Sequence, residues 1–422
     1  MGIEGRDMDI RDDEPAIVAL ASSASGEPRS EMLSDMTKDF SLVSGGPFYQ
    51  FLVRIGLVKE PLERVVWRAV IITLVAWVPL LLLAMLDGRI VSGVRVPFLY
   101  DIETQVRFLL CLPLLIGAEV ATYREMRILV PQFVEQQIIT PTMFPKFESC
   151  VRSAIRLRNS PLVESGFLVF IIFLGTFLWR ALLSVHTSTW YLGVSGTSRT
   201  LSTAGYWYVF VSLPIVEFIC LRWYFRLFIW ARFLWQISRM DLNLIPSHPD
   251  RRCGLGFLGQ IVFGVAPFIL AHSILLSGFV ANSILHEGAK LSQYGIEIGI
   301  MAVFLFLLAL GPLFVFTPGL IQQSKAAVYS YGSLAGEYVN EFQKKWIRGQ
   351  HPAGEQLIGT PDLQSLADLA NSFSIVQHIV PVPFTKESLF YLVGLIALPL
   401  VPLLLTMFSA REMAERLLKV LF

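Results

Sequence analysis

The sequence predicts an all-α, polytopic membrane protein, built as a transmembrane bundle of about seven helices. The chain of 422 residues is 54% hydrophobic and only 16% charged, whereas soluble domains carry about 25% charged residues. Its mean hydropathy is +0.59. The apolar residues gather in blocks close to the roughly 20 residues that cross a hydrocarbon core as a helix. These three observations exclude an ordinary soluble protein.

Residues 1–45 are predicted to form a disordered acidic tail. They hold ten acidic and four basic residues, a net charge of −6, so residues 46–422 carry +7. The tail is rich in Ser, Gly and Ala and nearly lacks aromatic residues, so it cannot bury enough apolar surface to offset its ordering entropy. It is not expected to be a secretory signal, because the first long apolar run begins only near Val65.

Seven segments are predicted to span the membrane, namely residues 65–86, 108–122, 166–183, 204–221, 261–284, 298–321 and 389–408. The second is short and contains Glu119, so a tilted or partly buried helix is its alternative. Pro399 and Pro402 allow the last segment to break and re-enter instead of crossing.

The distribution of Lys and Arg predicts the orientation, because cytoplasmic loops are enriched in both residues. With a cytoplasmic N-terminus, the cytoplasmic loops hold 20 of these residues and the outer segments hold eight. Three of those eight lie in residues 409–422, which we expect to form a short amphipathic C-terminus. Trp190, Tyr191 and the run 206–208 flank the third and fourth spans on the outer side and predict an interfacial aromatic belt.

Residues 322–388 are expected to form a cytoplasmic helical insertion. The sixth span continues as a helix to Trp346, and a second helix begins near Thr360 and Pro361, a cap and a first helical residue. The second helix carries an apolar stripe that needs a partner, most simply the first helix. The stripe consists of Leu363, Leu366, Leu369, Ala370, Phe373 and Val376.

Ionisable side chains are costly to bury within a membrane span, so those that occur there indicate candidate functional sites. Glu119 and Glu217 lie 12 and 13 residues from the outer ends of their helices, which places both carboxylates about 18 to 20 Å deep. His272 is expected near the bilayer centre. Together the three residues predict an intramembrane cation or proton site.

Each of these residues also has a purely structural alternative. The glutamates pair with nearby interfacial bases such as Arg124 or Arg222, and the histidine forms a hydrogen bond with a helix carbonyl. Arg68, near the inner end of the first span, is expected to extend its guanidinium to the interface.

Two basic pairs predict contact with an anion or a lipid headgroup. Arg222 and Arg226 lie where the fourth span leaves the bilayer, as in a helix that lies along the inner interface or tilts through it. Arg251 and Arg252 precede residues 254–259, a G-x-G-x-x-G string, where backbone N–H groups at a helix start hold phosphate. The string lacks the strand and the acid of a dinucleotide site. Its alternative is a tight loop that lets the fifth span start close to its neighbours.

Several classes of function are not expected. The four cysteines lie far apart and indicate neither a disulfide framework nor a zinc site. No Ser/His/Asp, Cys/His or paired-carboxylate arrangement lies where it could be presented, and H-x-x-x-H spacing does not occur. We therefore expect no enzyme activity, no cofactor and no metal. Basic residues follow the bilayer faces, so no nucleic-acid partner is expected.

Four stretches resemble a family of hypothetical bacterial inner-membrane proteins. They are Gly359–Phe373, Val382–Phe384, the proline-rich Ala397–Met407 and the loop His248–Gly259. The resemblance covers about the last 175 residues and implies the bacterial cytoplasmic (inner) membrane. It implies no activity and no site residue.

The leading hypothesis is an integral inner-membrane protein that mediates passage of an ion or small solute between helices. Its expected partners are the lipid bilayer, further copies of itself and a cytoplasmic protein. The alternative is a non-transporting scaffold or sensor that binds partners through residues 322–388 and the acidic tail, and an enzyme acting on lipid ranks third. A common cavity for Glu119, Glu217 and His272 distinguishes passage from scaffold.

Overall fold

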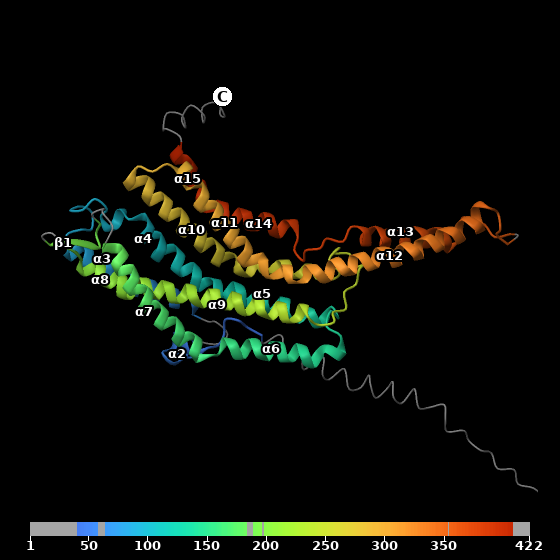
Figure 1. Cartoon of the computed structure of the whole chain (residues 1–422), viewed down its shortest axis with the longest axis horizontal. Helices are drawn as coiled ribbons and strands as arrows, with labels where there is room; N and C mark the ends of the chain where they lie inside the picture. The colour runs from blue at the N-terminus through green and yellow to red at the C-terminus, as the bar shows by residue number, and fades with distance from the viewer. Residues whose placement is uncertain (1–39, 58–63, 184–188, 196–197, 353, 408–422) are drawn as a thin grey trace, which may run out of the picture.

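The computed structural model describes residues 40–57, 64–183, 189–195, 198–352 and 354–407. These residues are almost entirely helical (Figure 1). Their strands are β1 (Leu192–Ser195) and β2 (Ser198–Leu201), which pair antiparallel with Leu192 opposite Leu201. The predicted all-α class is confirmed.

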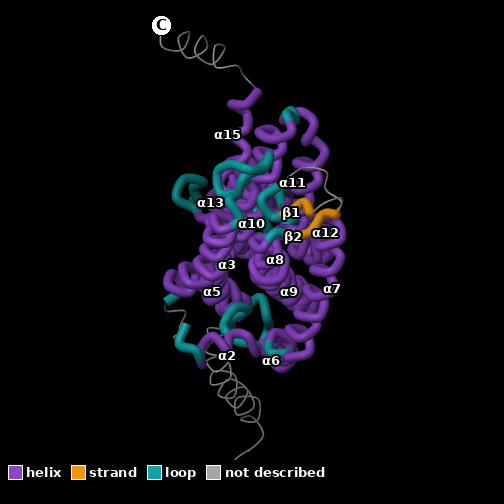
Figure 2. The backbone as a smooth tube through the Cα atoms, turned by 90° about the vertical axis from the view of Figure 1, so that its left-hand side faces the viewer, coloured by secondary structure: helices purple, strands orange, loops and turns teal. Residues whose placement is uncertain are grey.

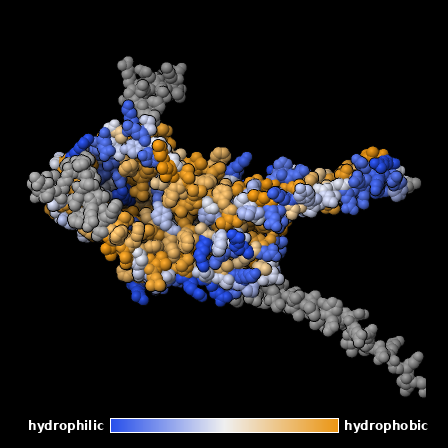
Figure 3. Space-filling view, viewed as in Figure 1, coloured by the Kyte–Doolittle hydropathy of each residue, from blue (hydrophilic) through white to orange (hydrophobic). Residues whose placement is uncertain are grey.

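Seven helical segments of the described chain are long and apolar enough to cross a membrane, and each overlaps one predicted span. They are Val65–Leu86, Ile102–Glu135, Pro141–Gly175, Thr203–Ser238, Gly256–Glu287, Leu291–Ile347 and Lys386–Leu404. Hydrophobic residues form a broad zone over the surface of the bundle (Figure 3). The chain therefore has the fold of a polytopic membrane bundle.

Two of the segments that extend well beyond their predicted spans contain a π turn near their start. A short α-helix, a π turn and a long α-helix follow one another in each. They are α4 (Ile102–Val106), η2 (Arg107–Cys111) and α5 (Leu112–Glu135), then α8 (Thr203–Trp207), η4 (Tyr208–Ser212) and α9 (Leu213–Ser238). Pro113 and Pro214 follow the two π turns. Proline lacks the N–H that a regular helix uses, so the helix is locally rewound there.

Helix α10 (Ile261–Glu287) packs along α5 through a stripe of small residues. Gly264, Ala271 and Gly278 recur every seven residues on α10. The Thr122 hydroxyl donates to the Gly264 carbonyl at 2.8 Å, and the Cys111 thiol donates to the Ala271 carbonyl at 3.2 Å. Small residues let two membrane helices approach closely enough for such bonds.

The remaining helices complete the bundle and its extensions. They are α2 (Pro47–Arg54), α3 (Val65–Leu86), α6 (Phe144–Arg158), α7 (Pro161–Leu183), α11 (Gly295–Leu310), α12 (Thr317–Phe342), α13 (Pro361–Gln377), α14 (Lys386–Ala397) and α15 (Val401–Leu404). Helices α2 and α6 lie together on one side of the bundle (Figures 1 and 2). Helices α12 and α13 form a hairpin that extends beyond the bundle (Figure 1). The partner predicted for the apolar stripe of α13 is therefore α12.

The last apolar segment is interrupted at its prolines. A 3-10 turn, Leu398–Leu400, separates α14 from α15. The hydroxyls of Ser273 and Ser277 on α10 donate to the carbonyls of Ile396 and Pro399, at 2.5 and 2.6 Å. Backbone groups freed by a break within a bilayer need such partners. These two serines therefore bind one helix to another.

The packed part of the chain begins before the predicted boundary at residue 45. Phe40 is fully buried and stacks on Phe233 at a centroid distance of 5.1 Å. Ser41, Leu42 and Val43 are also buried. The rest of the predicted acidic tail, residues 1–39, and the predicted C-terminal segment 409–422 lie outside the described residues.

Candidate functional site

The three intramembrane candidates lie in three different surroundings. Glu119 bonds two arginines and lines a small cavity with them. Glu217 lines a separate, larger pocket at one end of the bundle. His272 bonds a tyrosine between α9 and α10. The structure therefore does not bring the three residues into one cavity, and the passage hypothesis loses the support that a shared cavity would have given.

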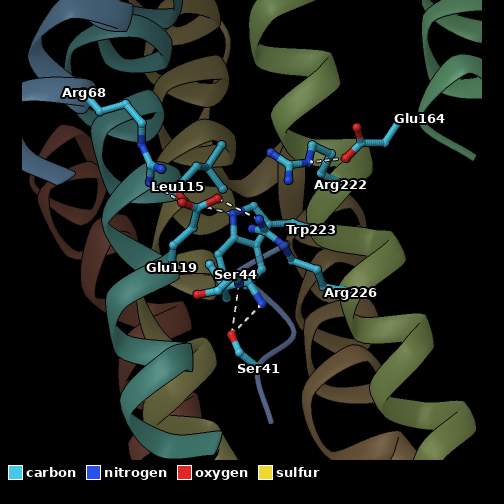
Figure 4. A network of polar contacts seen from close by, with 10 residues as sticks. Ser41, Ser44, Arg68, Leu115, Glu119, Glu164, Arg222, Trp223 and Arg226 are labelled. Atoms are coloured by element: carbon cyan, nitrogen blue, oxygen red, sulfur yellow. Dashed lines mark hydrogen bonds and ion pairs between the residues drawn. The ribbon is translucent and has the colours of Figure 1, made fainter. Parts of the chain in front are cut away.

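Glu119 is held by two buried arginines from neighbouring helices (Figure 4). Arg226 Nη2 donates to its Oε1 at 2.8 Å, and Arg68 Nη2 donates to its Oε2. All three residues are at most 8% exposed. The alternative of pairing with a base is confirmed, although with other bases than those expected. The expected extension of Arg68 to the interface is wrong, because its guanidinium turns inward to this carboxylate.

Arg222 and Arg226 do not lie on a surface helix at the interface. Helix α9 continues without a break to Ser238, and both guanidiniums are buried between helices. Arg222 Nε lies 3.4 Å from Oε1 of Glu164, and its guanidinium lies 4.8 Å from the ring centroid of Phe48. Of the two predicted geometries, the helix lying along the interface is excluded, because the helix continues and both arginines face carboxylates on α5 and α7.

His272 connects two helices through both ring nitrogens. Nδ1 lies 2.9 Å from the Phe268 carbonyl one turn earlier on α10, and Nε2 lies 2.7 Å from the Tyr224 hydroxyl on α9. The residue is 5% exposed. The hydrogen bond to a helix carbonyl is therefore confirmed, and it explains the residue as a structural contact.

The loop before the fifth span is organised around Asp250. Its carboxylate accepts hydrogen bonds from the backbone N–H groups of Arg252 at 2.7 Å, Gly256 at 2.9 Å and Gly254 at 3.2 Å. Burial acts to raise the pKa of Asp250, but these N–H groups and His248 lower it below its usual value. The anion at this helix start is therefore a carboxylate of the chain itself.

Arg251 and Arg252 lie in the same loop, which binds the segment before α14. Arg252 Nε donates to the Phe384 carbonyl at 3.0 Å, and the Arg251 carbonyl accepts from the Val380 N–H at 2.8 Å. A Cβ atom at Gly259 would lie 2.9 Å from the Phe384 Cα atom. The glycine thus permits close approach, as the tight-loop interpretation expected.

A polar pocket of about 580 Å³ lies at the end of the bundle opposite the hairpin, between the π-turn helices and α10 (Figure 1). We call it the acidic pocket, because Asp101, Glu103, Glu217 and Glu287 line it against a single arginine, Arg107. A volume of this size is typical of small-molecule sites.

One wall of the acidic pocket is fixed by Asp101. The carboxylate caps α4 by accepting from the Thr104 N–H at 3.2 Å, and it accepts from Trp190 Nε1 at 2.8 Å. Trp190 is fully buried, and Tyr191 stacks on Tyr208 at 5.7 Å. The predicted aromatic belt is wrong for these residues, because they pack against each other around a carboxylate.

The π turns η2 and η4 each place their first residue, Arg107 and Tyr208, in the lining of the acidic pocket. Arg107 Nη1 donates to the Tyr208 hydroxyl at 2.5 Å, and Nη2 bonds Glu103. The extra residue of a π turn re-aims side chains, and such turns are frequent at functional sites. Arg107 is therefore paired with Glu103, and among the described residues the other three acids of the pocket form no ion pair.

Glu217 forms the deeper part of the acidic pocket. It lies nine residues along the helix from Tyr208, about 13 Å at the rise of an α-helix. Among the described residues, no side chain forms a hydrogen bond or an ion pair with it, and no three His, Cys, Asp or Glu side chains are placed to hold a metal ion.

Comparison of the chain with protein-family models, with curated proteins and with solved structures finds no match. The chemistry of the site is therefore the basis for a function. Of the acidic pocket, the sequence predicted only Glu217 as functional. The available signal for the others was a proline six residues after both Arg107 and Tyr208, which marks the two helix irregularities.

Proposed function

We propose that this protein is an integral membrane protein that binds a small organic cation in the acidic pocket. The observation that carries the proposal is the excess of acidic side chains in a pocket of about 580 Å³, where Asp101, Glu217 and Glu287 have no ion-pair partner among the described residues. Tyr191 and Tyr208 also line the pocket, and aromatic side chains favour ammonium groups. We propose binding without an enzymatic step.

The proposed setting is the bacterial inner membrane, with the N-terminus in the cytoplasm. The distribution of Lys and Arg supports this orientation, and it places the acidic pocket on the outer side. Passage of the cation across the bundle would begin at this pocket. Beyond Glu217 the bundle is filled by buried side chains such as Leu115 and Trp223, so passage requires these helices to separate.

The deciding experiment measures binding to the purified full-length protein by isothermal titration calorimetry. Choline is the probe, and its uncharged isostere, in which carbon replaces nitrogen, tests the charge. We expect choline to bind and the isostere not to bind. Glu217→Gln is expected to weaken choline binding at least tenfold, about 1.4 kcal/mol.

The matched control is Glu297→Gln. Glu297 is an exposed acid in the first turn of α11, at the same end of the bundle but outside the pocket. Equal affinities for choline and its isostere would reject the proposal. Choline flux into liposomes, compared between the wild type and Glu217→Gln, then tests passage: a binder without flux would be a receptor and not a transporter.

The hairpin of α12 and α13 supports the alternative function of a scaffold. It extends beyond the bundle, and Leu334 and Ile358 are 53% and 92% exposed on it. Exposed apolar residues on a projecting element favour contact with another protein or another copy of the chain. Replacing both residues by Ser would remove such a partner in a cross-linking experiment while leaving choline binding unchanged.

A further inference from the structure

Among the described residues the charges around Glu119 do not balance, although Arg158 and Glu164 are only half-buried. Four arginines, Arg68, Arg158, Arg222 and Arg226, face two carboxylates, Glu119 and Glu164, in adjoining cavities of about 10 Å³ each. This group of six residues, the arginine cluster, carries an excess of two positive charges. An uncompensated buried charge is costly, so a further anion at this place would be stabilising.

Arg222 has N–H donors that form no hydrogen bond with the described residues. Its side chain is 9% exposed, and its Nε ion pair with Glu164 at 3.4 Å is its polar contact among the described residues. Its terminal nitrogens are turned away from Glu164 (Figure 4). Each terminal nitrogen carries two N–H donors. A nine-tenths buried guanidinium thus presents unused donors to the cluster.

An apolar groove of about 710 Å³ adjoins the arginine cluster. Its walls come from α2, α3, α7 and α9, and it shares Phe48, Leu52, Ile72 and Ile219 with the cavity of Arg68 and Arg222. The groove follows η4 and α9 from Phe210 to Ile219, about 13 Å of helix. These helix positions lie within the membrane spans, so the groove is open to lipid.

The arginine cluster lies at the depth of lipid headgroups. Arg222 follows the start of α8 at Thr203 by 19 residues, about 28 Å of helix, which nearly equals the hydrocarbon thickness of about 30 Å. Glu164 and Arg68 lie in the first turns of α7 and α3, at the same end. Arg54 at the end of α2 adds an exposed positive charge nearby.

We propose that the groove and the arginine cluster together bind one anionic phospholipid. An acyl chain lies along α9 in the groove, and a phosphate oxygen accepts hydrogen bonds from the terminal nitrogens of Arg222. The cavity of about 10 Å³ holds an oxygen-sized group, so the rest of the headgroup lies at the mouth, beside α2. This site is separate from the acidic pocket.

Native mass spectrometry of the full chain, in a mixture of phosphatidylglycerol and phosphatidylcholine with the same acyl chains, tests the proposal. We expect one phosphatidylglycerol to be retained at least tenfold over phosphatidylcholine. Val75→Trp fills the groove and leaves every charge in place, and Arg222→Gln removes the donors. Both variants are expected to lose the lipid. Val303→Trp, an equal change at a lipid-facing position of α11 outside the groove, is expected to keep it.

Two results would overturn the proposal. Equal retention of the two lipids would show that charge does not select the occupant. Stabilisation of the protein by inorganic phosphate that is unchanged in Val75→Trp would show that the cluster takes a free anion instead. A cooperative thermal unfolding transition reports folding of each variant independently of choline binding, so failure of Arg222→Gln to fold is recognised, and Val75→Trp then decides.

Discussion

Arg226 donates a hydrogen bond of 2.8 Å from Nη2 to Oε1 of Glu119, across the interface of α9 and α5. Arg68 of α3 donates to the other oxygen of the same carboxylate. One buried carboxylate therefore joins three membrane helices. Its removal leaves two guanidiniums without their counter-charge in a place that water hardly reaches.

Glu119→Gln is expected to destabilise the fold strongly. Breaking a buried ion pair from one side costs about 3–5 kcal/mol, because the remaining charge stays buried and uncompensated. Thermal unfolding of the purified protein measures the change. Glu217→Gln is the matched control: it makes the same substitution at a carboxylate without an ion partner, and its unfolding midpoint is expected to stay near that of the wild type. Equal midpoints for the two variants would contradict this role of Glu119.

Two glycine substitutions are expected to have opposite effects. Gly259→Ala places a Cβ atom 2.9 Å from the Cα atom of Phe384, where only backbone can give way, so we expect a loss of about 1–3 kcal/mol. Gly299→Ala on α11 meets open space and is expected to gain about 0.5–1 kcal/mol from the reduced backbone freedom of alanine. Unfolding midpoints on either side of the wild-type value would support the close approach; two shifts in the same direction would contradict it.

Hydropathy located the spans because apolar runs of about 20 residues are typical of membrane-spanning helices. It could not give the rotation of each helix, which decides whether Arg68 reaches the interface or Glu119. For one helix pair the sequence did indicate the packed face of the helix. Small residues recur every seven positions on α10, at Gly264, Ala271 and Gly278. The loop around Asp250 was predictable as a tight turn. The sequence did not show that the carboxylate of Asp250 itself accepts the backbone N–H groups at the predicted anion site.

The acidic pocket was less predictable than the spans. Glu217 stood out because an acid in an apolar run is rare. Asp101 and Glu103 lie before their span, where acids are ordinary, and Arg107 joins them only because a π turn re-aims it. The site forms where four segments far apart in the sequence meet. Local sequence patterns do not predict contacts between such segments.

Asp250→Asn is expected to destabilise the loop at neutral pH and to change its pH dependence. The charged carboxylate accepts three backbone N–H bonds, and hydrogen bonds to charged groups contribute about 1.5–3 kcal/mol. The pKa of Asp250 is lowered in the folded protein. Its stabilisation is therefore complete above the unfolded value of about 3.9 and is lost as the pH falls through the lowered folded value.

The measurement is the difference in unfolding midpoint between the wild type and Asp250→Asn, followed from pH 7 downward. The difference is expected to be constant to about pH 4 and to shrink below it. Asp241→Asn, at an exposed acid of the same loop, serves as the control for the general effect of acid. A difference that grows as the pH falls would show that the carboxylate is not the stabilising form.

Arg107→Gln is expected to tighten the binding of choline in the acidic pocket. The substitution removes the one arginine of the lining and releases Glu103 from its ion pair, so the local negative charge increases. We expect about a tenfold gain in affinity at low salt, equal to about 1.4 kcal/mol, and a smaller gain at high salt because ions screen exposed charges. Titration calorimetry at two salt concentrations measures both. Loss of affinity in Arg107→Gln as large as that in Glu217→Gln would mean that the shape of the pocket, and not its charge, selects the ligand.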